Sequence, residues 1–186
     1  MNPPIRHTED KDKLWERLKD GTIDCVVTDH APHTLEAKSV GYPKAPAGMP
    51  GVETSLPLML THAIDGKCSV SDVVRWMCEG PAKVYNIENK GSLIEGYDGD
   101  LTLVDLETHR TITDADTWTK VGWTPYNGFE LTGLPMWTIV DGIPVFFGDE
   151  VFDEITGEVK SFYETNPFPS YDGIEDFGKL VEKGKA

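Results

Sequence analysis

The feature that most constrains the fold is a short apolar strand that follows directly on a helix. The residue pattern predicts a helix over Glu9–Asp20, with Thr8 as its N-cap and Gly21 as its C-terminal stop. Ile23–Val27 comes next and is rich in β-branched residues, which favours a strand. A helix that leads at once into an apolar strand is typical of an α/β barrel or a doubly wound sheet.

A carboxylate and two imidazoles follow the predicted strand. Asp29 lies just past its end, with His30 and His33 close behind. In α/β barrels the catalytic groups lie at the carboxyl ends of the strands. Such a cluster can serve acid–base chemistry or metal ligation. The alternative is that Asp29 caps a turn and the histidines bond to loop carbonyls, and the cluster by itself leaves both interpretations open.

A long loop, from Ala31 to Val52, holds four prolines and three glycines. Loops of this length are usually functional or disordered. Helical patterns resume over Ser55–Ile64 and Val70–Met77, and Gly80-Pro81 begins a third short helix. Residues 1–90 are therefore predicted to be the α/β part of the chain.

The pattern changes after Lys90, where short β-type segments replace the helices. Strands are predicted at Ser92–Ile94, Asp100–Asp105, Met136–Val140 and Ile143–Phe147. Asp141-Gly142 between the last two is typical of a two-residue hairpin turn. We expect residues 91–150 to form a small β module and residues 151–186 an acidic C-terminal tail.

The charge distribution excludes some classes of function. The 186 residues carry a net charge of −15, and beyond residue 90 nineteen acidic residues stand against six basic ones. Phosphate repulsion would oppose nucleic-acid binding. No apolar run approaches the roughly eighteen residues that a membrane span needs. The three separated cysteines predict free thiols, and thus a cytoplasmic protein.

Several short segments carry a family likeness when they are taken in order. They are Asn2-Pro3-Pro4-Ile5-Arg6, Thr28–Thr34, Ala45-Pro46-Ala47-Gly48, Pro50–Thr54, Gly91–Leu101 and Trp123–Tyr126. Together they make residues 1–148 resemble the last part of the dihydroorotases, cyclic amidohydrolases of the amidohydrolase superfamily. The combination is far more specific than any one segment.

The resemblance implies a fold and a site. The fold is α/β: the last two strands and helices of a TIM-type (β/α)8 amidohydrolase barrel, followed by part of a small β-sandwich. Asp29 is implied to be a metal ligand and the catalytic carboxylate, which takes a proton from metal-bound hydroxide and passes it to the leaving amide nitrogen. Asn2, His33, Ala47 and Gly48 are implied to contact the substrate.

The implied activity is the zinc-dependent, reversible hydrolysis of dihydroorotate to N-carbamoyl-aspartate in pyrimidine synthesis. The family's site holds two metal ions, and the histidines, bridging group and arginine that complete it have no counterpart in this sequence. We therefore expect a C-terminal fragment that is inactive by itself. Its expected partners are the small-molecule substrate, the remainder of its own chain and, in a homodimer, a second copy.

Two alternatives stay open. Another cyclic amidohydrolase, such as an allantoinase or a hydantoinase, would share this part of the fold, although the Asn-Pro-Pro and Ala-Pro-His segments argue against it. A non-catalytic dihydroorotase-like chain would instead act as a scaffold for aspartate transcarbamoylase. The presence of Asp29, Asn2 and His33 argues against that role.

Overall fold

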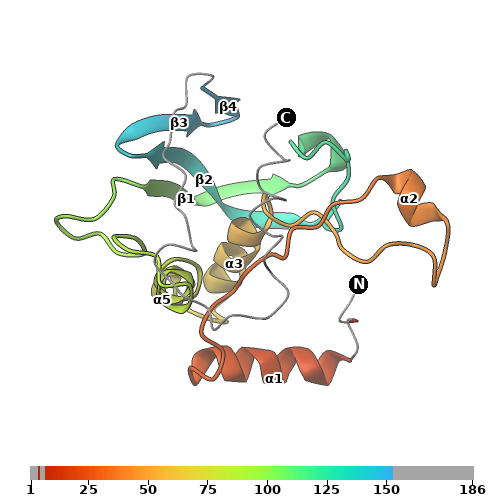
Figure 1. Cartoon of the computed structure of the whole chain (residues 1–186), viewed down its shortest axis with the longest axis horizontal. Coiled ribbons are helices and arrows are strands. Elements are labelled where there is room, and N and C mark those ends of the chain that lie inside the picture. The colour runs from red at the N-terminus through yellow and green to blue at the C-terminus, as the bar shows by residue number, and fades with distance from the viewer. Residues whose placement is uncertain (1–3, 5–6, 153–186) are drawn as a thin grey trace, which may run out of the picture.

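The computed structural model describes residue 4 and residues 7–152, and in this part helices lead into an antiparallel sheet (Figure 1). The helices are α1 (Thr8–Lys19), α2 (Leu35–Ser39), α3 (Ser55–Ile64), α4 (Val70–Val74) and α5 (Gly80–Val84), with a π-helical turn η1 (Arg75–Glu79) and a 3-10 turn η2 (Asp114–Asp116). The strands are β1 (Leu101–Thr111), β2 (Glu130–Val140), β3 (Ile143–Phe147) and β4 (Glu150–Val151). No helix among these is long and apolar enough to cross a bilayer.

Helix α1 begins slightly earlier than predicted. His7 is the N-cap and Thr8 is the first helical residue, so the assignment of Thr8 as N-cap is wrong. The Asp10 carboxylate accepts a hydrogen bond from the His7 N–H at 3.3 Å, which satisfies a donor at the helix start. The helix ends at Lys19, one residue before the predicted end, with Asp20 as its C-cap. The predicted stop at Gly21 is confirmed, because Gly21 follows the C-cap with a φ of +80°. Leu18 is buried in the core.

The segment predicted as a strand, Ile23–Val27, forms no ladder with another strand in the described part of the chain. A parallel barrel strand is defined by hydrogen bonds to neighbouring strands, and residues 7–152 supply none beside it. Its backbone is held from the helical side instead, where the Val26 N–H donates to the Trp76 carbonyl at 2.9 Å.

The π-helical turn η1 explains why that carbonyl is available. The Gly80 N–H reaches back to the Arg75 carbonyl, five residues away. The next donor in this pattern would be Pro81, which has no N–H, so the Trp76 carbonyl has no partner within the helix. It accepts from Val26 instead. The two helices predicted over 70–77 and from Gly80 therefore form one continuous helical run with a wide turn in its middle.

The core lies where α1, α3 and this helical run meet. Leu60 and Val73 are 2% exposed and Trp76 is 1% exposed. The Trp15 ring meets that of Trp76 edge-on, with 6.1 Å between centroids. Burying each such side chain contributes about 1.5–3 kcal/mol to folding, so this cluster anchors the helical part.

The sheet has the order β1-β2-β3-β4 and is antiparallel throughout. Asp141 and Gly142 both have positive φ, as the predicted hairpin turn requires. Strands β1 and β2 are longer than predicted. In β1, two register shifts interrupt the alternation that would reveal a strand. The strand predicted at Ser92–Ile94 is absent from the described structure, where these residues form bends and coil.

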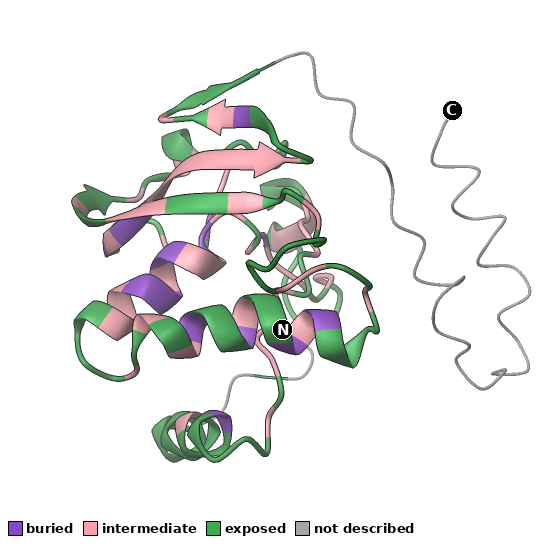
Figure 2. Ribbon diagram, turned by 90° about the vertical axis from the view of Figure 1, so that its left-hand side faces the viewer, coloured by how far each residue is buried: buried purple, intermediate pink, exposed green. Residues whose placement is uncertain are grey.

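Helix α3 lies between the sheet and α1 (Figure 1), and Figure 2 shows buried residues on its side of the sheet. The Thr132 N–H in β2 donates to Thr61 Oγ1 in α3 at 2.9 Å. A Cβ placed on Gly133 would lie 2.9 Å from the Leu60 Cβ, so glycine permits the close approach of helix and strand. This packing joins the helical part to the sheet.

Candidate active site

Asp29 lies at the end of the extended segment and has an uncommon backbone conformation. Its φ is +43°, in the left-handed region that most residues other than glycine avoid and that aspartate tolerates better than most. Its side chain is exposed, and no carboxylate hydrogen bond or ion pair is found for it within the described residues. Backbone strain of this kind is concentrated at functional sites. The conformation aims the carboxylate in a direction that extended backbone would not give.

The long loop folds back so that Gly48 lies against Ala31. The Ala31 N–H donates to the Met49 carbonyl at 3.2 Å. A Cβ on Gly48 would stand 2.5 Å from the Ala31 carbonyl oxygen, and the φ of Gly48 is +106°. Only glycine fits this position. The contact places the Ala47–Gly48 turn beside the segment that carries Asp29.

Lys38, at the end of α2, braces the same turn. Its Nζ donates to the carbonyl oxygen of Pro46 at 2.8 Å and to that of Gly48 at 2.6 Å. The two carbonyls belong to the residues before and after Ala47, whose side chain is exposed. Helix α2 is itself fixed by Thr34 Oγ1, which accepts from the Ala37 N–H at 3.2 Å.

The two histidines behave differently. His30 Nδ1 accepts from the N–H groups of Gly51 at 3.1 Å and Val52 at 3.2 Å, so a neutral His30 carries its proton on Nε2 and ties the end of the loop. His33 is half-buried, and its carbonyl accepts from Trp123 Nε1 at 2.8 Å. Trp123 therefore connects the loop to the segment between β1 and β2.

Glu53 makes a second connection to that segment. Its carboxylate accepts from the backbone N–H of Trp118 at 2.7 Å and of Thr119 at 2.9 Å. Sequence reasoning missed the roles of Lys38, Glu53 and Trp123, because all their partners are main-chain atoms, which leave no mark on the residue pattern.

The predicted site residues are assembled in part. Asp29, His33, Ala47 and Gly48 come from two stretches that touch at Ala31, whereas Asn2 lies outside the described residues. Their roles as ligands stay predictions. Among the described residues no group of three histidine, cysteine or acidic side chains is placed to hold a metal ion. This part of the chain thus offers Asp29 as one oxygen ligand and does not by itself fit a metal site.

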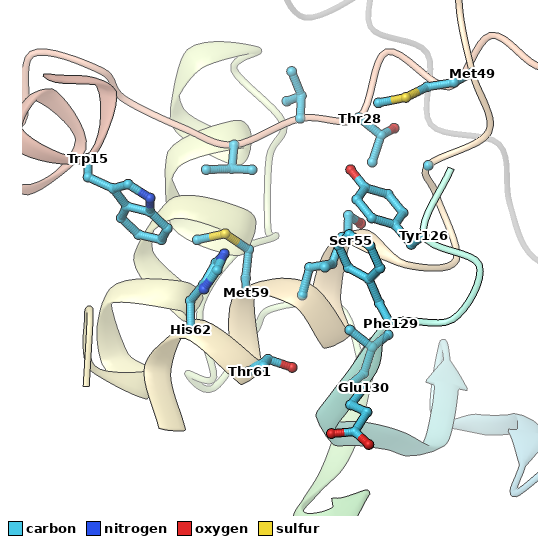
Figure 3. A pocket seen from close by; sticks show the side chains of 15 residues that line it. Trp15, Thr28, Met49, Ser55, Met59, Thr61, His62, Tyr126, Phe129 and Glu130 are labelled. Carbon is cyan, nitrogen blue, oxygen red and sulfur yellow. The ribbon is translucent and has the colours of Figure 1, made fainter. Parts of the chain in front are cut away.

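An apolar groove of about 450 Å³ includes Thr28, the neighbour of Asp29, in its lining. Figure 3 shows the side chains that line it. Its wall is formed by Trp15 of α1, by Val27 and Thr28 of the extended segment, by α3 and by residues 126–131. Trp15 and His62 meet edge-to-face on one side. None of the predicted site residues lines it. The groove reaches Thr28, the residue before Asp29, and is distinct from the candidate site.

Comparison with known proteins shows the family to which this architecture belongs. A sequence model described as "Amidohydrolase family" matches residues 6–150. The dihydroorotase of Staphylococcus aureus is 41% identical over 151 residues, which cover 81% of this chain and 35% of that protein. The dihydroorotase of Halobacterium salinarum is 44% identical over 151 residues, with 81% and 36% covered.

Comparison with solved structures finds the same fold in hydantoinases. An L-hydantoinase from Arthrobacter aurescens superposes with a TM-score of 0.76 at 37% identity, over 81% of this chain and 34% of that one. A D-hydantoinase from Thermus sp. gives a TM-score of 0.78 at 27% identity, over 83% and 35%. The chain spans about a third of the length of the relatives it matches.

The arrangement is that of one part of an amidohydrolase fold. The chain belongs to the amidohydrolase family, and among its relatives are dihydroorotases. The expected fold class is confirmed: α/β, with the last elements of an amidohydrolase barrel followed by part of a β-sandwich. The division at residues 90 and 150 stays a prediction.

Proposed function

We propose that residues 1–186 form the C-terminal third of a dihydroorotase, which interconverts dihydroorotate and N-carbamoyl-aspartate in pyrimidine synthesis in the cytoplasm. The observation that carries the proposal is Asp29, held in a left-handed conformation beside the turn at Gly48. Identities of 41–44% to dihydroorotases support this substrate class.

The chemistry assigned to Asp29 is proton transfer. Opening the ring adds a water oxygen to the amide carbonyl carbon, and the carbon–nitrogen bond then breaks. The carboxylate takes a proton from the water and gives it to the leaving nitrogen, which would otherwise depart as an unstable anion. His33 and the Ala47–Gly48 backbone hold the substrate, together with Asn2.

A binuclear zinc centre would supply an activated water and polarise the amide carbonyl. Asp29 is one ligand in this proposal, and the remaining ligands belong to the other two thirds of the enzyme. The apolar groove beside Asp29 is where that remainder packs, which makes the rest of the barrel the first partner of this chain. A homodimer of the complete enzyme is the second.

The test compares variants of a full-length enzyme that contains residues 1–186. Asp29→Ala should lower kcat/KM for dihydroorotate by about a thousandfold or more, because proton transfer contributes roughly 10² to 10⁴ and a metal ligand is lost as well. Asp24→Ala is the control, since Asp24 is also exposed on the extended segment. Activity retained in Asp29→Ala contradicts the proposal.

A second candidate function is that of a hydantoinase, favoured by the solved hydantoinases with TM-scores of 0.76 and 0.78. Assays of the intact enzyme with dihydroorotate, hydantoin and dihydrouracil decide between them. Hydrolysis of none of these would favour a scaffold for aspartate transcarbamoylase, which a co-purification experiment detects.

A further inference from the structure

Lys38 has unusual partners for a cationic side chain. Its half-buried ammonium group donates to two carbonyl oxygens of one turn, those of Pro46 and Gly48, and no carboxylate pairs with it in the described structure. Charge-assisted hydrogen bonds are shorter and stronger than neutral ones, and both distances are short. One side chain thus fixes the Pro46–Ala47 peptide plane and the Gly48–Met49 peptide plane.

The geometry of the peptide unit determines which way the Ala47 N–H points when Lys38 holds the Pro46 carbonyl. In a planar trans peptide the C=O and the following N–H point in opposite directions. With the Pro46 carbonyl turned toward Lys38, the Ala47 N–H points away from it. No described residue accepts a hydrogen bond from the Ala47 N–H. The turn therefore presents a backbone donor on the side opposite Lys38.

We propose that Lys38 is a positioning residue, which holds the Ala47 N–H ready to bind a carbonyl or carboxylate oxygen of the substrate. This inference rests on the proposed function and adds a residue to it. The positive charge of Lys38, next to the Ala47–Gly48 turn, also favours binding of an anionic substrate over a neutral one. Because Lys38 acts through the backbone, it need not touch the substrate.

The effect should be on binding more than on chemistry. Without the brace, the Ala47 turn has to be ordered when substrate binds, and the cost of that ordering weakens the complex. Asp29 lies on a different segment, where the Val26 N–H donates to the Trp76 carbonyl, and Lys38 makes no contact with its carboxylate among the described residues. KM for dihydroorotate should therefore rise while kcat changes little.

The experiment measures kcat and KM for dihydroorotate in the intact enzyme with Lys38→Met, Lys38→Gln and Lys38→Arg. Met keeps the chain length without a donor, Gln can reach one carbonyl, and Arg can reach both. We expect KM to rise about tenfold in Lys38→Met, the equivalent of one charge-assisted hydrogen bond, with kcat within about twofold. Gln should be intermediate, and Arg should restore most of the affinity.

Lys44→Met is the matched control, because Lys44 is exposed in the same loop and has no side-chain partner among the described residues. It should leave KM unchanged. An unchanged KM in Lys38→Met and Lys38→Gln, or an equal rise in Lys44→Met, overturns the inference while the proposed function stands. If Lys38→Met does not fold, the order of KM among wild type, Arg and Gln decides. A wild-type enzyme inactive on dihydroorotate overturns both.

Discussion

His62 illustrates how the surroundings of one side chain set its protonation. Its ring meets Trp15 edge-on at 5.1 Å between centroids, and Lys67 Nζ lies 3.1 Å from its Nδ1. Burial, and next the positive charge of Lys67, lower the pKa of His62 below its ordinary value near 6.5, against a smaller opposing effect of Asp65. The ring is therefore a neutral packing partner of Trp15 in the groove.

This predicts a pH dependence of stability. In the unfolded chain His62 gains a proton near pH 6.5, whereas in the folded chain it does so only at lower pH. The unfolded state thus binds more protons as the pH falls through 6.5, and the free energy of unfolding decreases. His62→Phe keeps a ring beside Trp15 and removes the titration.

The measurement is urea unfolding of the 186-residue chain, as wild type and as His62→Phe, between pH 7.5 and 5.5. The loss of unfolding free energy on acidification should be smaller in the variant. Identical pH profiles for the two proteins would show that His62 titrates normally in the folded state.

At the scale of elements, Glu53 joins the start of α3 to the segment between β1 and β2. Glu53→Gln removes the charge from the acceptor of the Trp118 and Thr119 N–H groups and leaves a single amide oxygen. We expect the free energy of unfolding to fall by about 1–3 kcal/mol, the usual cost of losing such hydrogen bonds. Glu88→Gln, at an exposed site without a partner in the described structure, is the control and should change stability by less than about 0.5 kcal/mol.

Individual elements differ in how far the sequence predicts them. Helix α3 and strand β3 have the predicted bounds, because their periodicity is regular and their ends carry turn residues. Ile23–Val27 has strand composition but no ladder, since a ladder depends on neighbours that the local pattern cannot supply. The bulged strand β1 extends to Thr111 although its alternation stops early.

The site residues differ in the same way. Asp29 could be identified from the sequence because it follows an apolar run. The hydrogen bonds of Lys38 to the Pro46 and Gly48 carbonyls depend on backbone positions that only a structure gives.

At the scale of the whole molecule, two apolar surfaces are among those exposed by the described residues. One is the groove beneath Thr28, and the other is a row across the sheet in which Leu103, Trp137 and Phe147 are cross-strand neighbours. The Trp137 and Phe147 rings lie 4.1 Å apart, and Leu103 and Phe147 are 47% and 43% exposed. Apolar surfaces of this kind mark places where other protein packs.

The groove leads to a prediction for the assembled enzyme. Residues 1–186, mixed with a separately produced polypeptide that carries the remaining two thirds, should associate and hydrolyse dihydroorotate with added zinc. Val27→Glu should prevent association, because it places a charge in the groove. Val40→Glu is a matched control, since both valines are 57% exposed and Val40 lies outside the groove.

Size-exclusion chromatography and the hydrolysis assay test this together. The chain by itself should neither hydrolyse dihydroorotate nor bind zinc stoichiometrically. Activity of the isolated chain, or association that Val27→Glu leaves intact, would show that the groove is not the contact surface.

The fit of Gly48 against Ala31 also has an evolutionary consequence. The obstacle to a side chain at position 48 is a main-chain oxygen, so no replacement of Ala31 can remove it. Lineages that retain the path of this loop have no single-step route to another amino acid there. Departures from glycine at this position should therefore coincide with insertions or deletions between residues 31 and 48, a signature that a set of homologous sequences can reveal.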